Sequence, residues 1–211
     1  MASHIALLGD SIFDNRAYTG GEPDVVAHLS RRLPPTWRAT LCAVDGCTTA
    51  DLAEQCASVP RDASHLVISV GGNDALLNSD LLETPVASTT EALWLFGDRV
   101  AQFEIAYRAA IDGVLRLKRD TTTCTIYNGM LEGGEAPLAR VALMMFNDVI
   151  LRVAFERRLG IIDLRLVCTE AADYANPIEP SGRGGKKIAD AIAEALGAGS
   201  AEAAHAKVFG R

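Results

Sequence analysis

The chain is poor in the residues that build metal centres and disulfide scaffolds. Its 211 residues include four histidines and five cysteines, and aromatic residues make up only 6%. The cysteines form no CxxC pair and their number is odd, so we expect reduced thiols rather than a disulfide framework. The sequence has neither a His/Cys cluster nor a phosphate-binding glycine loop. We therefore predict that the protein uses no metal or nucleotide cofactor.

An excess of positive charge and long apolar runs are missing as well. The formal net charge of −7 argues against a nucleic-acid partner, which requires a concentrated basic surface. No apolar run approaches the roughly 20 residues that a helix needs to cross a bilayer, so we expect no membrane partner. The first residues, Met-Ala-Ser-His, lead into an apolar strand without the features of a secretory signal, which favours a cytoplasmic location. Nothing in the sequence indicates an oligomeric state.

Short apolar runs alternate with longer segments of helical periodicity. The predicted strands cover residues 5–8, 37–44, 65–70, 122–127 and 161–163. The predicted helices cover residues 24–33, 49–57, 98–118, 137–159 and 184–196. In the helix over 137–159, the residues expected to face inward are Leu138, Val141, Met145, Val149 and Val153. This alternation predicts one α/β domain over residues 1–197, with a parallel sheet between two helical layers, followed by a C-terminal tail over 198–211.

Residues with chemical potential follow the first three predicted strands. Ser11 follows the first strand, Gly46 follows the second and Asn73 follows the third. Ligands bind beyond the carboxyl ends of the strands in such sheets, so we expect these residues at one edge. Ser11 could attack a carbonyl carbon, while its own N–H, the Gly46 N–H and the Asn73 amide could stabilise the oxyanion. Each residue taken alone also fits an ordinary turn or helix-cap position.

These local sequences resemble the first three blocks of the GDSL/SGNH hydrolase family. The matching segments are GDSIFDN at 9–15, DGCTTADL at 45–52 and VGGND at 70–74. The resemblance implies a three-layer α/β/α, flavodoxin-like fold with a five-stranded parallel sheet, and hydrolysis of a small-molecule ester or thioester through an acyl-enzyme. It gives Ser11 the role of nucleophile and Gly46 and Asn73 the role of oxyanion hole. Asp10, beside the serine, is expected to have a structural role at the turn.

The last block of that family, in which Asp-x-x-His precedes Pro-Ser, is altered in this chain. Alignment on the Pro-Ser pair at 180–181 places Glu179 at the position of the histidine and Asn176 at that of the aspartate. A serine hydroxyl attacks only if a partner accepts its proton. No histidine is an obvious replacement, because the four lie at strand starts, on the first helix or in the tail; they are His4, His65, His28 and His205.

Three interpretations of Glu179 remain open. It could act as the general base for Ser11, since a dry pocket raises the pKa of a carboxyl above its usual value of ~4.3. The site could instead bind an acyl or carbohydrate ligand with little or no turnover, in a binding protein that lost its base. Glu179 could also be a surface carboxylate near a helix N-terminus. We adopt the first interpretation, which predicts a serine esterase with an unusual base.

Three neighbouring features also carry alternatives. Arg183 and Lys186, at the start of the last helix, either attract an anionic substrate or are solvated helix charges. The aromatic segment 94–96 either forms an apolar wall for an acyl group or packs in the core. Asn15, shortly after the serine, either lines the pocket entrance or completes a turn.

Overall fold

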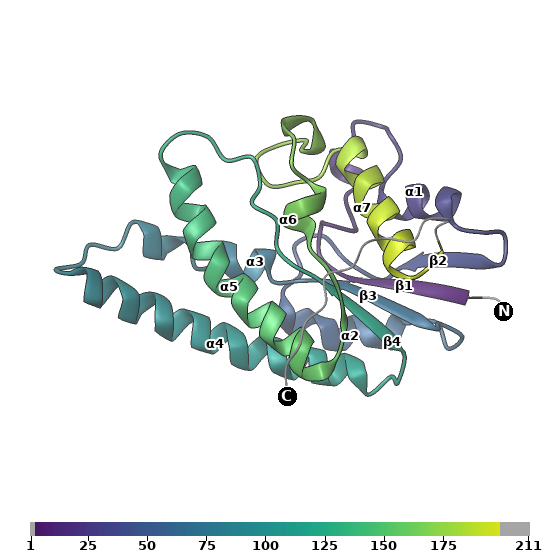
Figure 1. Cartoon of the computed structure of the whole chain (residues 1–211), viewed down its shortest axis with the longest axis horizontal. Helices are drawn as coiled ribbons and strands as arrows, with labels where there is room; N and C mark the ends of the chain where they lie inside the picture. The colour runs from purple at the N-terminus through teal and green to yellow at the C-terminus, as the bar shows by residue number, and fades with distance from the viewer. Residues whose placement is uncertain (1–2, 199–211) are drawn as a thin grey trace.

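A parallel β-sheet forms the centre of the computed structural model, which describes residues 3–198 (Figure 1). The strands are β1 (Ser3–Gly9), β2 (Trp37–Leu41), β3 (His65–Ser69), β4 (Asp120–Cys124) and β5 (Gly160–Ile162). Their order across the sheet is β2-β1-β3-β4-β5, and every neighbouring pair is parallel. The predicted five-stranded α/β fold is therefore confirmed.

Helices cover both faces of this sheet. They are α1 (Val25–Arg32), α2 (Leu52–Ser58), α3 (Gly72–Leu76), α4 (Thr89–Leu115), α5 (Glu135–Arg157), α6 (Leu164–Val167) and α7 (Gly182–Ala195). Short 3₁₀ turns add η1 (Arg16–Tyr18), η2 (Thr49–Asp51), η3 (Ser79–Leu82) and η4 (Ala171–Asp173). Alternate residues of β1 point to opposite faces, so Ile5 and Leu7 pack against α1 and α7, whereas Ala6 and Leu8 pack against α2, α4 and α5. The two apolar cores on either side of the sheet make the three layers.

Two details of the helix predictions are wrong. Helix α4 begins at Thr89, well before the predicted residue 98, because the Ser88 side chain caps it by accepting a hydrogen bond from the N–H of Glu91 at 3.1 Å. Leu138 and Val141, expected to face inward, are 54% and 58% exposed. The first turns of α5 extend past the strands (Figure 1), so no sheet lies beneath them and their inner side borders a cavity instead.

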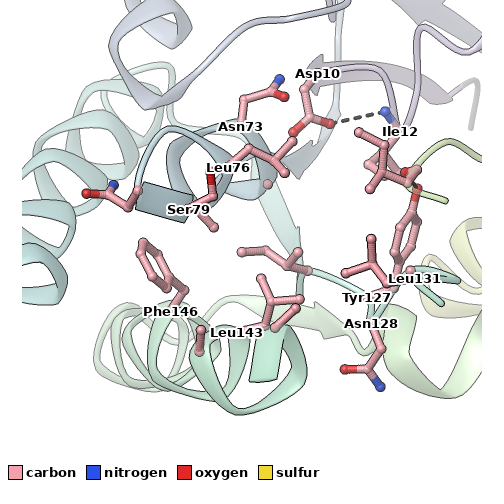
Figure 2. Close-up of a pocket in the computed structure, with 18 of the residues that line it drawn as sticks. Asp10, Ile12, Asn73, Leu76, Ser79, Tyr127, Asn128, Leu131, Leu143 and Phe146 are labelled. Carbon is pink, nitrogen blue, oxygen red and sulfur yellow. Dashed lines mark hydrogen bonds between the residues drawn. The ribbon is translucent and has the colours of Figure 1, made fainter. Parts of the chain in front are cut away.

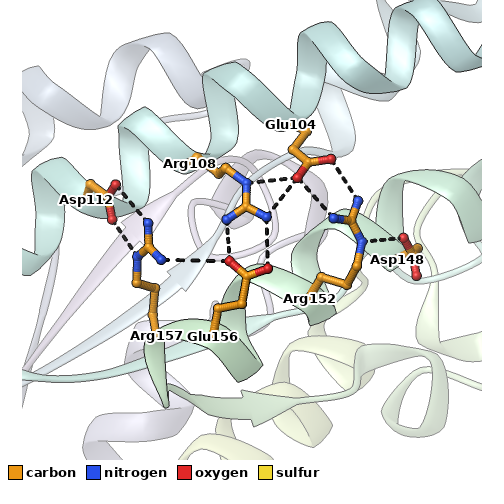
Figure 3. Close-up of polar contacts among 7 residues, drawn as sticks. All are labelled: Glu104, Arg108, Asp112, Asp148, Arg152, Glu156 and Arg157. Atoms are coloured by element: carbon orange, nitrogen blue, oxygen red, sulfur yellow. Dashed lines mark hydrogen bonds and ion pairs between the residues drawn. The ribbon is translucent and has the colours of Figure 1, made fainter. Parts of the chain in front are cut away.

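Ion pairs join the later turns of α4 and α5 (Figure 3). Glu104 accepts hydrogen bonds from Arg108 at 2.8 Å and from Arg152 at 2.8 and 3.0 Å. Hydrogen bonds from these two guanidinium groups lower the pKa of Glu104 to about 2. The network continues through Glu156, Arg157, Asp112 and Asp148. This network joins the two helices on the C-terminal side of Phe96 in α4 and Phe146 in α5, which border the cavity.

Part of the chain lies outside this description. Residues 1–2 and 199–211 are not described, so His205 and nearly all of the predicted tail fall outside it. Within residues 3–198, no helix is long and apolar enough to cross a bilayer. The single domain over 1–197 stays a prediction.

Candidate active site

Ser11 lies on a tight turn where the chain leaves the carboxyl end of β1. Gly9, the last residue of β1, has a φ of 128°, and a Cβ added there would lie 1.7 Å from the Ser69 carbonyl oxygen. Only glycine fits such a position. The buried Gln55 side chain holds the same residue, because its Oε1 accepts from the Gly9 N–H at 2.7 Å and its Nε2 donates to the Gly9 carbonyl at 2.8 Å. This turn places Ser11 at the edge of the sheet.

Asn73 and Gly46 follow the two strands that flank β1. Asn73 stands in the first turn of α3, and its Nδ2 donates to the Cys47 carbonyl at 2.9 Å. One of its two amide hydrogens is therefore engaged and the other is available. Gly46 has a φ of 81° and is exposed, and it does not line the cavity that Ser11 and Asn73 share. Within residues 3–198, the N–H groups of Ser11 and Gly46 donate no hydrogen bond.

A cavity of about 300 Å³ opens beside Ser11, and Figure 2 shows many of the residues that line it. Its polar residues include Asp10, Ser11, Asn73 and Glu179. Much of its wall is apolar and comes from α3 to α5, the segments between them and the loop before α7; these side chains include Leu76, Leu82, Phe96, Ile126, Leu131, Leu143, Phe146 and Ile178. In Figure 2, Asp10 and Asn73 lie on one side of the cavity, with Leu143 and Phe146 on the opposite side. An apolar cavity with a few polar groups is the usual form of a small-molecule site.

The two aromatic residues of the segment 94–96 lie in different places, and neither packs in the core. Phe96 lines the cavity, as the apolar-wall interpretation expects. Trp94 is 70% exposed and belongs neither to the wall nor to the core. The reason is the early start of α4, which puts both residues on a helix that points them to different sides.

Glu179, at the position of the missing histidine, is only 7% exposed and lines the same cavity as Ser11. This burial excludes the surface-carboxylate interpretation. Burial raises the pKa of the Glu179 carboxyl, the Ser11 hydroxyl lowers it in part, and the charge of Asp45 raises it again. The buried Oε2 atom has no hydrogen-bond partner within residues 3–198. A buried polar atom without a partner is costly, and in a cavity it is a candidate for contact with a ligand.

Backbone hydrogen bonds shape the loop that carries Glu179. The Asn176 Oδ1 accepts from the N–H groups of Ile178 at 3.0 Å and Glu179 at 2.9 Å. The Ala175 N–H donates to the Glu179 carbonyl at 2.9 Å. From outside the loop, the Tyr127 hydroxyl donates to the Ile178 carbonyl at 2.5 Å. Asn176, which stands at the position of the family's aspartate, thus organises the backbone around Glu179.

Asp10 is a second buried carboxyl in the cavity, for which the sequence indicated only a structural role. That role exists, because its Oδ1 accepts from the Ile12 N–H at 3.1 Å (Figure 2). Asp10 is only 3% exposed, however, and burial raises its pKa to about 8; the Ile12 N–H opposes this shift, and the charges of Glu179 and Asp74 add to it. The carboxyl is therefore mostly protonated at neutral pH. No local sequence signal shows this, because the Asp10 carboxyl is buried, and approached by the charge of Glu179, only in the folded chain.

The other predicted candidates lie away from the cavity. Lys186 forms an ion pair with Asp190 at 2.7 Å, and Arg183 pairs with Glu170. Their side chains are 63% and 53% exposed, as expected for solvated helix charges. The histidines in the described part do not line the cavity; they are His4 in β1, His28 in α1 and His65 in β3. The same range of residues contains no group of three or more His, Cys, Asp or Glu side chains that could hold a metal.

Comparison with known proteins adds to this geometry. The family model of the GDSL-like Lipase/Acylhydrolase family matches residues 7–187. The chain belongs to this family. Membership in the GDSL-like lipase/acylhydrolase family agrees with the predicted resemblance and supports an acyl hydrolase that acts on small ester substrates. Among curated proteins, no sequence matches the chain significantly.

Solved structures with the same fold include several esterases and lipases. An extracellular lipase from Streptomyces rimosus has a TM-score of 0.68 at 16% identity, with 92% of this chain and 100% of that chain covered. Phospholipase A1 from Streptomyces albidoflavus gives 0.67 at 16% identity over 92% and 99% of the two chains. A catalytic mutant of an acetylxylan esterase from Geobacillus stearothermophilus gives 0.68 at 19% identity over 93% and 96%. At these low identities, the likeness to solved structures shows only that this GDSL-like family member has the same fold. Its cytoplasmic location stays a prediction.

Proposed function

We propose that this GDSL-like family member is a serine esterase that cleaves an ester with an apolar acyl group, with Ser11 as nucleophile and Glu179 as general base. The observation that carries the proposal is the shared cavity. Ser11 and Glu179 are 6% and 7% exposed, and both border the same largely apolar space. A nucleophile, a buried base and an apolar wall are the elements that acyl transfer requires.

In the proposed reaction, Glu179 accepts the Ser11 hydroxyl proton while the Oγ atom attacks the ester carbonyl. The leaving alcohol takes this proton from Glu179 as the acyl-enzyme forms. Water then attacks the acyl-enzyme and gives a proton to Glu179, which passes that proton to the Ser11 Oγ as the bond between Oγ and the acyl carbon breaks and the acid product departs. The raised pKa of Glu179 makes its carboxylate a stronger base than a solvated one.

The oxyanion of the tetrahedral intermediate would form near two carboxyl groups, so local charge matters. The proposed donors are the Ser11 N–H and the second amide hydrogen of Asn73, whereas Gly46, the third predicted donor, is not part of the cavity wall. Protonation of Asp10 at neutral pH removes one negative charge from their neighbourhood. The neutral form of Asp10 therefore favours catalysis, because an ionised carboxylate there would repel the oxyanion.

The apolar wall supports a substrate with a hydrocarbon acyl chain. A volume of about 300 Å³ corresponds to roughly ten water molecules at about 30 Å³ each, which leaves room for several methylene groups. Burial of each methylene contributes about 0.8 kcal/mol, so each added carbon that stays inside the cavity is expected to raise kcat/KM by about three- to fourfold.

Hydrolysis of p-nitrophenyl esters from acetate to dodecanoate tests the proposal, with wild type, Ser11→Ala and Glu179→Gln compared from pH 5 to 9. We expect both variants to lose at least about 100-fold in kcat/KM, and the wild-type profile to show a base limb. Glu179→Asp keeps a carboxylate and is the matched control, so it should retain more activity than Glu179→Gln. Full activity of Glu179→Gln would remove this residue from the mechanism.

A second candidate function is a binding protein with this fold and little or no turnover. The observation in its favour is that no histidine within residues 3–198 lines the cavity, so the usual base for the serine is missing there. Saturable binding of a fatty acid that survives Ser11→Ala, together with no serine-dependent product from any ester, would assign the chain to that class.

A further inference from the structure

The proposed chemistry brings together two loops from opposite ends of the chain. The loop with Ser11 follows β1, and the loop with Glu179 precedes α7. Helices α1 and α7, which follow these loops, pack against each other on the same face of the sheet. That packing brings the loops into one region, but proton transfer requires alignment within a fraction of an ångström. A more local link between the loops is needed.

Asn15 supplies such a link. Its side chain is fully buried, with 0% exposure, and its two polar atoms reach different parts of the chain. The Nδ2 atom donates to the Pro180 carbonyl at 3.2 Å, and the Oδ1 atom accepts from the Val25 N–H at 3.0 Å. Pro180 directly follows Glu179, and Val25 is the first residue of α1. One amide thus joins the Ser11 loop, the Glu179 loop and the start of a core helix.

The surroundings of Asn15 are matched to an amide of this length. A Cβ added to Gly185, in the first turns of α7, would lie 3.1 Å from the Asn15 Nδ2. A longer glutamine side chain would have no room there without a shift of α7. Aspartate has the right size but offers no donor to the Pro180 carbonyl, which would then face another acceptor in a site without water access.

We propose that Asn15 is a positioning residue for the reaction, because its amide fixes the Glu179 loop against the Ser11 loop and so sets the approach of the Glu179 carboxyl to the Ser11 hydroxyl. This inference rests on the proposed function. Asn15 is not among the residues that line the cavity, so the pocket-entrance alternative is wrong. Its carbonyl accepts from the Tyr18 N–H at 2.9 Å in the turn η1, as the turn alternative expects, while its side chain makes the link between the loops. We expect Asn15 to affect the reaction rate only by setting the position of the Glu179 carboxyl.

Asn15→Asp tests this role, since it keeps the side-chain size and the acceptor for the Val25 N–H. Asn147→Asp is the matched control. Asn147 is 1% exposed, and its amide bridges the Ile126 N–H and carbonyl at 2.8 Å each, on the other face of the sheet. Both substitutions remove one fully buried amide donor, but only Asn15 contacts the Glu179 loop. Asn15→Ser, which is too short to reach Pro180 and adds no charge, repeats the measurement if Asn15→Asp does not fold.

The decisive measurement is a double-mutant cycle on p-nitrophenyl butyrate hydrolysis, at a temperature at which circular dichroism shows all variants folded. We expect Asn15→Asp to lower kcat by about 100-fold, with KM within about threefold, and Asn147→Asp to change kcat by less than about threefold. In the Glu179→Gln background, Asn15→Asp should lower kcat by less than about a further threefold, because the Glu179 carboxylate that Asn15 positions is already absent.

Other results would overturn the inference. Wild-type kcat in Asn15→Asp, or a further 100-fold loss in the Glu179→Gln background, would each show that Asn15 does not act through Glu179. An equal loss in Asn147→Asp would show that the effect is not specific to the link between the two loops. These outcomes are distinct from failure of the proposed function, in which Glu179→Gln itself keeps wild-type activity.

Discussion

Asp10→Asn tests the electrostatics of the cavity without any substrate. Burial raises the pKa of Asp10 from 3.8 to about 8, so the folded protein disfavours its ionised form. Each unit of pKa difference between folded and unfolded states corresponds to about 1.4 kcal/mol, and ionisation of Asp10 in the fold therefore costs on the order of 5 kcal/mol. Because the folded pKa is the higher one, this stability is complete below a pH of about 4 and is lost as the pH rises to about 8.

The substitution keeps the shape of the side chain and the acceptor for the Ile12 N–H, but the amide does not ionise. Relative to wild type, the free energy of unfolding of Asp10→Asn should therefore increase by about 1.4 kcal/mol per pH unit between pH 5 and 8, and stay level above pH 9. Urea unfolding followed by circular dichroism at several pH values measures this difference. Asp98→Asn, at an exposed aspartate of α4, controls for the loss of one negative charge.

A difference between Asp10→Asn and wild type that does not change with pH would refute the reasoning, because Asp10 would then be ionised throughout and the cavity would not be dry. The same ionisation has a catalytic consequence. Wild-type kcat/KM should fall above pH 8, where Asp10 gains its charge near the oxyanion, and Asp10→Asn should lack this alkaline limb.

Three further substitutions test the fold and the cavity. Gly9→Ala places a Cβ 1.7 Å from the Ser69 carbonyl oxygen, and we expect a fall in Tm of about 10 °C or more in thermal unfolding. Glu104→Gln should cost about 1 kcal/mol at pH 7 and less in 1 M salt; since the pKa of Glu104 is lowered to about 2, this contribution should vanish as wild type is acidified from pH 4.5 towards 2. Ala142→Trp fills part of the cavity and should lower kcat/KM for an octanoate ester by about tenfold or more, with the acetate ester little changed.

The fold and the location of the serine could be predicted because both depend on local pattern. A short apolar run followed by glycine marks where a buried strand ends, and parallel strands with helical crossovers bring such ends to one edge. Gly9 is an example: its φ at the end of β1 is positive, a conformation that favours glycine, so the glycine in the sequence marks where the strand ends. The roles of Gly46, Asn73 and Glu179 in catalysis remain predictions.

The rest depends on contacts that no local pattern encodes. Asn15 and Pro180 are far apart in the sequence, and only the packing of α1 against α7 makes them neighbours. The high pKa of Asp10 likewise requires the burial of its side chain in the folded protein, and the charge of Glu179 adds to the shift. On α5, Leu138 and Val141 continue the helical stripe of the buried residues, but the sheet ends before it reaches them. Periodicity identifies a face of a helix, whereas tertiary structure decides how far along that face the core extends.

Covalent labelling by a fluorophosphonate probe, mapped by peptide mass spectrometry, tests the pairing of Ser11 with Glu179 most directly. We expect the adduct on Ser11 in the wild type, no adduct in Ser11→Ala, and labelling about 100-fold slower in Glu179→Gln. Labelling of a different residue, or labelling of Ser11 at the wild-type rate in Glu179→Gln, would contradict the account.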